Sequence, residues 1–332
     1  MLTISKDKSL LIKGIVICMM VWLHLFNGNH TDLLINLLYV GEEPFAKWLS
    51  NACGPVSFFL LLSGYGLAFT YDKGNLSLKG QIRRLFKLYV HYWVVLMLFV
   101  PLGCFVAVYR YPGSWKNILV NVTGWHTTYN GEMWFLFPYC IVALASPLIF
   151  KTMEKVGCVQ SLLFSAMIQI ATCFCISRYG VQFLFGNMLL YQPLLFFHFL
   201  YPFVLGAFLF RSKMTFDMQL SQWMIIVLVI LVVSIVATFG NAVVYMVYVP
   251  LMVWLFSQLI WPKWLENVLI ELGRKSMVIW MVHTWFCYYL FQPQVYSLRY
   301  PILIMVGGIL ISYLTAIPIM WFTDKVLKWM KI

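Results

Sequence analysis

"LLIKGIVICMMVWLHLFNGN", residues 10–29, decides the fold class. The run is close to the roughly 20 apolar residues that a helix needs to cross a bilayer. Within it, Lys13 and His24 interrupt the apolar pattern. A charge near the centre of a bilayer costs about 2.5–3.5 kcal/mol on insertion scales. Two such residues in one span therefore mark a place where function should be sought.

The rest of the chain is equally apolar. Of its 332 residues, 62% are hydrophobic and 10% are charged, whereas a soluble domain has about 25% charged residues. We expect an all-α polytopic membrane protein in which residues 1–332 form a single transmembrane domain. Ten apolar runs predict about ten transmembrane helices: 9–26, 53–71, 85–108, 133–150, 157–177, 191–210, 221–239, 242–260, 276–292 and 300–323.

The net charge of +12 is distributed along the chain in a way that predicts topology. Lys and Arg gather in every second segment between the runs, as the positive-inside rule requires of cytoplasmic loops. This alternation places both termini in the cytoplasm and predicts a multi-pass protein of the cytoplasmic membrane, with the lipid bilayer as its partner. Nucleic-acid binding is not expected, because the basic residues form no single patch.

Lys13 and His24 share one face of the first span. Eleven residues at 100° each make three turns and about 20°, and they separate the two side chains by about 16 Å along the axis. The pair can therefore line one path through the membrane. An alternative remains open, in which Lys13 extends to the inner headgroups and His24 lies at the outer interface.

Few other ionisable residues fall within the spans. They are Lys87 near an inner edge, His91, His198 and His283, while Glu132 lies at the outer edge of the fourth span. Packing or interfacial positions are the expectation for His91 and His198. No two histidines stand on one helix at ligand spacing, so no metal site is predicted.

Five segments, taken in order, resemble motifs of the type-three acyltransferase family, which are integral membrane O-acyltransferases of bacterial surface glycans. The first is the Lys13–His24 pair, which is similar to the family's basic residue, ten-residue spacer and histidine. The others are "GPVSFFLLLSGYGLAF" (54–69), "RRLFKLY" (83–89), "MWFLFP" (133–138) and "LGRKSMVIWMVH" (272–283). In the third segment, Lys87 stands where the family commonly has a second Arg, and Val90-His91 where members often have a proline.

The resemblance implies transfer of an acyl group, expected to be acetyl, from a cytosolic acyl-CoA such as acetyl-CoA. The expected acceptor is a hydroxyl of a surface or capsular polysaccharide or of a glycolipid. The resemblance also implies the stand-alone form, because the sequence stops after the tenth run without the SGNH-type esterase domain of some members. His24 is the candidate general base, since an imidazole titrates near physiological pH. Lys13 would steer the donor, and Arg84 and Lys87, one helical turn apart, would bind its phosphates.

Further site residues are predicted around this core. Glu132 would orient His24 or bind sugar, although an exposed acid at a helix N-terminus also suits the macrodipole. His283 follows Ser276 by two turns, so both would face a cavity. The remaining predicted cavity residues are Ser63, Tyr65 and Trp134. For Ser63-Gly64-Tyr65, close helix packing is the alternative explanation.

Two other classes of function remain open from the sequence. Ten helices with charges near the midplane also suit a transporter or exporter of glycan or small solutes, although the inverted repeats and paired acids common in transporters are not seen. A non-catalytic membrane partner of a glycan-assembly complex is the third interpretation. The oligomeric state is open, with a homodimer among the alternatives.

The predicted topology can be tested with reporter fusions. Reporters placed after Lys155, Lys213 and Lys331 are expected to read as cytoplasmic, and reporters within 27–52 and 109–132 as external, because basic loops stay inside. Alkaline phosphatase and a cytoplasmic fluorescent reporter at the same positions give opposite signals and control for expression. A C-terminus that reads as external would contradict the span count and the placement of His24.

Overall fold

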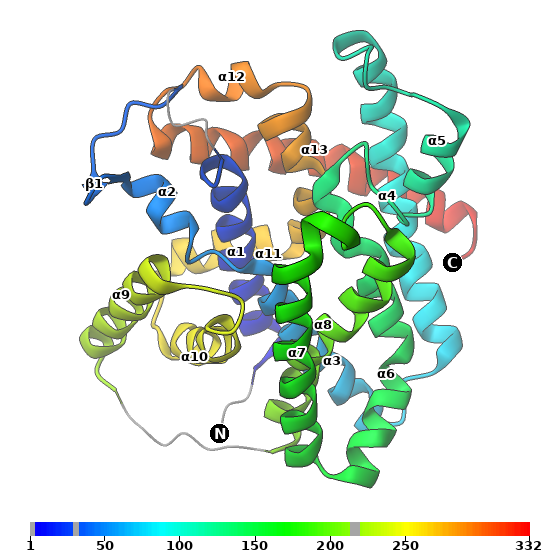
Figure 1. The fold of residues 1–332 in the computed structure, drawn as a ribbon, viewed down its shortest axis with the longest axis vertical. Coiled ribbons are helices and arrows are strands. Elements are labelled where there is room, and N and C mark those ends of the chain that lie inside the picture. The colour runs from blue at the N-terminus through cyan, green and yellow to red at the C-terminus, as the bar shows by residue number, and fades with distance from the viewer. Residues whose placement is uncertain (1–3, 29–32, 213–219) are drawn as a thin grey trace.

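The structure is a computed structural model that describes residues 4–28, 33–212 and 220–332. Figure 1 shows a bundle of helices packed side by side. Within the described residues, the strands are the two-residue β1 (Tyr39–Val40) and β2 (Glu43–Pro44), which pair antiparallel beside the short helix α2 (Phe45–Ser50). The predicted all-α class is confirmed. The Lys213 fusion site lies outside the described residues.

Eight helical segments in the described residues are long and apolar enough to cross a membrane. They are α1 (Lys6–Phe26), α2 with α3 (Pro55–Asp72), α4 (Leu78–Val106), η2 (Gly131–Phe135) with α6 (Leu136–Val156), α7 (Cys158–Tyr179) with η3 (Gly180–Leu184), α8 (Met188–Arg211), α9 (Gln222–Phe239) and α13 (Pro301–Trp329). The other helices are α5 (Trp115–Val122), α10 (Tyr245–Gln258), α11 (Lys263–Thr284) and α12 (Gln292–Tyr296), and the π-helical turn η4 (Trp285–Tyr289) follows α11.

Two of the ten expected spans differ from the prediction. Helix α10 has 14 residues and is too short to be among the eight. Helix α11 begins at Lys263, thirteen residues before the expected start at 276, and it carries Glu266, Glu271, Arg274 and Lys275 before that position. The sequence prediction recognised only the apolar C-terminal part of α11. The count of ten transmembrane helices stays a prediction.

The helices differ in how much of their surface is buried. Helices α1 and α3 are largely enclosed by their neighbours, whereas α7 and α9 expose large apolar side chains such as Phe164 and Ile230. An apolar surface of this extent is stable in lipid and not in water. The chain is therefore a multi-pass membrane protein with its polar groups directed inward.

Helix α1 packs against α11 more closely than ordinary side chains allow. A Cβ added to Gly14 would lie 1.9 Å from the carbonyl oxygen of Leu269, and a Cβ added to Gly273 would lie 1.9 Å from that of Leu10. Each glycine thus admits the backbone of the other helix, as small residues do at tight interfaces in membranes. Since Lys13 precedes Gly14 and Arg274 follows Gly273, this crossing also places two cations.

The close crossing predicts that Gly14→Ala and Gly273→Ala are strongly destabilising. A methyl group there meets backbone, which cannot move aside as a flexible side chain can, and overpacking typically costs about 1–3 kcal/mol. Thermal unfolding of the purified protein in detergent measures the loss. Gly66→Ala in α3 is the matched control, because nothing lies within 4 Å of its added Cβ. Equal stability of Gly14→Ala and Gly66→Ala would contradict the proposed packing.

Candidate active site

A cavity of about 600 Å³ opens among α1, α3, α4, α6 and α11. Basic side chains from three helices line it, namely Lys13 on α1, Arg84 and Lys87 on α4, and Arg274 on α11. Among the described residues that form its wall, none is Asp or Glu. Grouped cations without acids in the same wall give a site suited to an anion with several negative charges.

Tyr139 of α6 links two of the predicted residues at this cavity. Its hydroxyl lies 3.2 Å from Ser63 Oγ and accepts a hydrogen bond of 3.4 Å from Arg84 Nη2. Since the guanidinium can only donate, the tyrosine proton is free to bond Ser63. The three side chains connect α3, α4 and α6 and hold Arg84 at the cavity.

Arg274 differs from the other three cations because it already has an acidic partner. Its Nη1 lies 3.2 Å from Glu271 Oε2. The same carboxylate forms an ion pair with Lys275 and accepts a hydrogen bond of 3.2 Å from the hydroxyl of Tyr313 on α13. Glu271 is one turn before Arg274 and is not part of the cavity wall. Arg274 is therefore partly neutralised, and Lys13, Arg84 and Lys87 give the cavity most of its positive charge.

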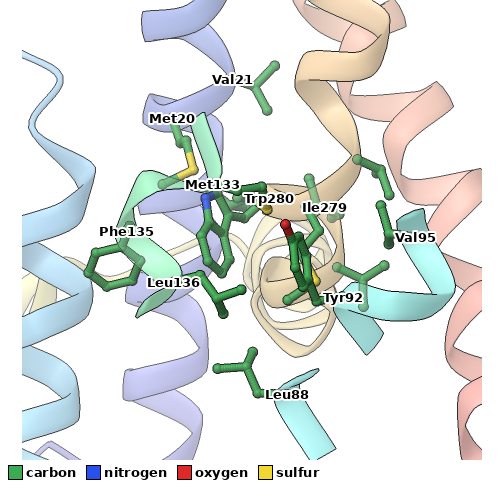
Figure 2. Close-up of a cluster of buried hydrophobic side chains, with 14 of the residues drawn as sticks. Met20, Val21, Leu88, Tyr92, Val95, Met133, Phe135, Leu136, Ile279 and Trp280 are labelled. Atoms are coloured by element: carbon green, nitrogen blue, oxygen red, sulfur yellow. The ribbon is translucent and has the colours of Figure 1, made fainter. Parts of the chain in front are cut away.

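The other end of the cavity is apolar. Met20 on α1 and Trp280 on α11, each about two turns after Lys13 and Arg274 on the same helices, form this part of its wall together with Phe135. Figure 2 shows Trp280 among Met20, Met133 and Phe135. The rings of Phe135 and Trp280 pack edge to face, with their centroids 5.5 Å apart. The polarity thus changes along the cavity from cationic to apolar.

A chain of three ionisable side chains lies beyond this apolar end. His24 Nδ1 is 2.8 Å from His283 Nε2, and His24 Nε2 is 3.2 Å from Glu132 Oε2. His283 is fully buried, His24 is 9% exposed, and the Glu132 side chain is 27% exposed. Glu132 therefore faces the more open side, and His283 closes the chain on the inside.

Neighbouring hydrogen bonds fix the position of Glu132. Thr284, next to His283, donates from Oγ1 to Asn130 Oδ1 over 2.9 Å, and the same oxygen accepts the backbone N–H of Glu132 at 3.2 Å. The backbone N–H of Gly131 donates a hydrogen bond of 2.8 Å to the hydroxyl of Tyr289 in η4. These bonds fasten η2 to the end of α11, so the acid and both histidines are held as one unit.

Trp280 connects the two parts of the site. It lines the cavity, its indole Nε1 donates to the backbone oxygen of Glu132 over 3.3 Å, and it precedes His283 by one helical turn. On α1, Met20 lines the cavity one turn before His24. A single layer of apolar side chains therefore separates the cavity from the Glu132–His24–His283 chain.

Most of the residues predicted from the sequence lie in one of these two places. Lys13, Ser63, Arg84, Lys87 and Ser276 line the cavity, while His24, Glu132 and His283 form the chain.

His283, also predicted to face the cavity, is instead fully buried and outside its wall, and two further predicted cavity residues lie elsewhere. Tyr65 is buried on the other side of α3, where its hydroxyl accepts the backbone N–H of Ile4 at 3.1 Å. Trp134 packs against Phe199, with ring centroids 5.8 Å apart, and is outside the cavity wall. In both cases the neighbouring residue in the helical turn, Ser63 or Phe135, faces the cavity instead.

Sequence reasoning missed Tyr139, Trp280 and His91. His91 lines the cavity, and its Nδ1 bonds the Lys87 carbonyl at 2.8 Å. Its spacing of four residues from Lys87 and seven from Arg84 is the helical repeat that would have placed it on the same face. His198, also expected to be a packing residue, lies 3.1 Å from Thr172 Oγ1 and is not part of the cavity wall.

Comparison with known proteins identifies the class of this molecule. A family model described as an acyltransferase domain matches residues 10–321. The chain therefore belongs to the type-three acyltransferase family, and it is a membrane acyltransferase. Searches of curated proteins and of solved structures found no match.

The basic wall of the cavity predicts a measurable role for Arg84 and Lys87 in donor binding. Charge-assisted hydrogen bonds contribute roughly 1.5–3 kcal/mol each, so replacing both with Ala is expected to raise the Kd for acetyl-CoA about tenfold or more. Added salt should reduce wild-type affinity in the same direction. Binding of labelled acetyl-CoA to the purified protein measures both effects.

Arg83→Ala supplies the matched control, because Arg83 is exposed on α4 and outside the cavity wall. It removes a neighbouring positive charge without touching the cavity. If the double variant and Arg83→Ala bind the donor with the same affinity, the cations of α4 are topology anchors and not a binding site.

Proposed function

We propose that this acyltransferase moves an acetyl group from cytosolic acetyl-CoA to a hydroxyl of a surface or capsular polysaccharide or its lipid-linked precursor, in the cytoplasmic membrane. One observation carries the proposal. A single cavity has cations at one end and an apolar end that lies one helical turn from a Glu–His–His chain.

The cavity suits both parts of an acyl-CoA. Lys13, Arg84 and Lys87 can pair with phosphates, and the apolar end beside Phe135 and Trp280 can receive the acyl thioester. Under the predicted topology the cationic end faces the cytoplasm, where acyl-CoA is made. Lys13 stands about 16 Å from His24 along α1, so the donor needs a long arm between its phosphates and its reactive carbon.

The chain beyond the cavity supplies the groups that acyl transfer needs. The acceptor hydroxyl would give its proton to His24 as its oxygen forms a bond to the thioester carbon, and the carbon–sulfur bond then breaks. His24 would return that proton to the departing thiolate. The negative charge of the Glu132 carboxylate, 3.2 Å from His24 Nε2, would stabilise the imidazolium in between.

Exposure of the chain supports the proposed acceptor. Glu132 is the most exposed member of the chain, and it lies at the end of the molecule that the topology prediction places outside. A carboxylate with nearby tyrosines, such as Tyr288 with its ring 6.0 Å from that of His24, suits a hydroxyl-rich acceptor. A polysaccharide meets that description.

The proposal predicts that His24 and Lys13 variants fail in different ways. His24→Ala is expected to lower turnover by roughly 10²–10⁴-fold, the usual size of general acid–base catalysis, with donor affinity largely kept. Lys13→Ala should weaken donor binding, and Lys13→Arg should retain part of the activity because the charge remains. Acyl transfer to a glycan acceptor and donor binding are both measured in purified membranes.

A gene deletion tests the same proposal in cells. Glycan from the deletion strain should lack a mass equal to one acetyl group, wild-type protein should restore it, and His24→Ala should not. Abundance of each variant in the membrane is the control, because a first span that fails to insert would also abolish activity. Normal glycan acetylation by an abundant His24→Ala protein would overturn the mechanism and favour the transporter alternative.

A further inference from the structure

His283 can donate from only one of its ring nitrogens in this site. Its Nδ1 lies 2.8 Å from the carbonyl oxygen of Trp280 and 3.1 Å from that of Ile279. Carbonyl oxygens only accept hydrogen bonds, so Nδ1 must carry a proton. A neutral histidine has one ring proton, and in a fully buried site the neutral form is the less costly one. His283 Nε2 is then a bare acceptor.

That acceptor determines the proton of His24. His24 Nδ1 lies 2.8 Å from His283 Nε2, so it must donate. We propose that His283 is a positioning residue that keeps the ring proton of His24 on Nδ1 and leaves Nε2 as its reactive nitrogen. This inference rests on the proposed function for its role in catalysis, but the position of the proton follows from the hydrogen bonds alone.

The proposal also defines where the transferred proton resides. His24 Nε2 faces Glu132 Oε2 at 3.2 Å, and two bare acceptors at that distance repel each other. A proton between them removes the repulsion, so this contact suits His24 once it has taken up a proton at Nε2. An acceptor hydroxyl that enters between the two groups would supply this proton. The titratable groups that face His24 among the described residues are Glu132, His283 and Tyr288.

Without His283, the ring proton of His24 would be on the wrong nitrogen for catalysis. The carboxylate of Glu132 would then be its only charged neighbour among these groups and would favour the neutral form with its proton on Nε2. The lone pair would move to Nδ1, which points away from Glu132 and from the open side. His283 therefore acts on the reaction through the tautomer of His24 and without contacting the substrate.

Nitrogen NMR of the full-length protein in lipid nanodiscs tests the proposal directly. The sample carries ¹⁵N-labelled histidine, and His24→Gln identifies the His24 signals. In its neutral form, His24 of the wild-type protein should show a protonated Nδ1 and an unprotonated Nε2. His283→Leu should reverse the two, whereas His283→Gln, whose amide oxygen can still accept from Nδ1, should keep the wild-type pattern.

Activity measurements give the second readout. His283→Leu should lower kcat by roughly 10²-fold or more with little change in acetyl-CoA affinity, because a wrong tautomer removes general-base catalysis. His283→Gln should recover part of that loss. A purely structural role for His283 would not move the ring proton and would not be rescued selectively by Gln.

The outcomes are distinguishable from failure of the proposed function. An unprotonated Nδ1 on neutral His24 of the wild-type protein would overturn the inference, and this result does not depend on the folding of any His283 variant. Unchanged kcat in His283→Leu would overturn the catalytic part. Wild-type protein that shows the expected proton on Nδ1 but transfers no acetyl group would support the role of His283 in fixing the tautomer and overturn the proposed function instead.

Discussion

The site depends on the close parallel packing of α1 against α11. Gly14 meets the backbone at Leu269, and Gly273 meets it at Leu10. The two helices are therefore closest near residue 12 of α1 and residue 271 of α11. Twelve residues farther along each helix are His24 and His283, which are in hydrogen-bond contact. The same crossing places Lys13 and Arg274 on the cavity wall. One packing constraint thus sets both ends of the site.

The distribution of charge follows from the low dielectric of the bilayer. A cation taken out of water needs an acidic partner or a bound anion, since the desolvation penalty is several kcal/mol per ion. Arg211, away from the cavity, has Asp72 at 2.6 Å and Glu154 at 3.2 Å. At the cavity the wall offers no carboxylate among its described residues. The difference separates a structural cation from cations arranged to meet an external anion.

The sequence was most informative about helix faces and least informative about helix rotation. Helical spacing put Lys13 and His24 on one face, and Arg84 and Lys87 one turn apart, because 3.6 residues per turn needs no tertiary information. Tyr65 and Trp134 were assigned to the cavity with their motifs, yet which residue of a motif faces inward depends on how the helix is rotated by its neighbours. For α3 that rotation is set by α8, where Gly64 approaches the backbone of Phe203.

Contacts between distant segments were beyond the sequence for a related reason. The bond between Tyr139 and Ser63, and the approach of Trp280 to Glu132, join residues 76 and 148 positions apart. An apolar pattern states that a residue is buried and not what it is buried against. His91 is the exception, because its spacing from Arg84 and Lys87 carried the information.

The layer formed by Met20, Phe135 and Trp280 is consistent with the proposed transfer between the two sides of a membrane. An open water-filled path from the cationic cavity to His24 would also conduct ions, whereas apolar side chains at this point exclude them. A donor bound with its phosphates at the basic end would keep all of its charge on one side of the layer. Only an uncharged acyl thioester would have to pass between the rings, and burying an apolar group there is favourable. Under the proposed function, the length of α1 between Lys13 and His24 separates recognition of charge from the chemical step, and a donor with a long uncharged arm is the kind of substrate that this separation would require.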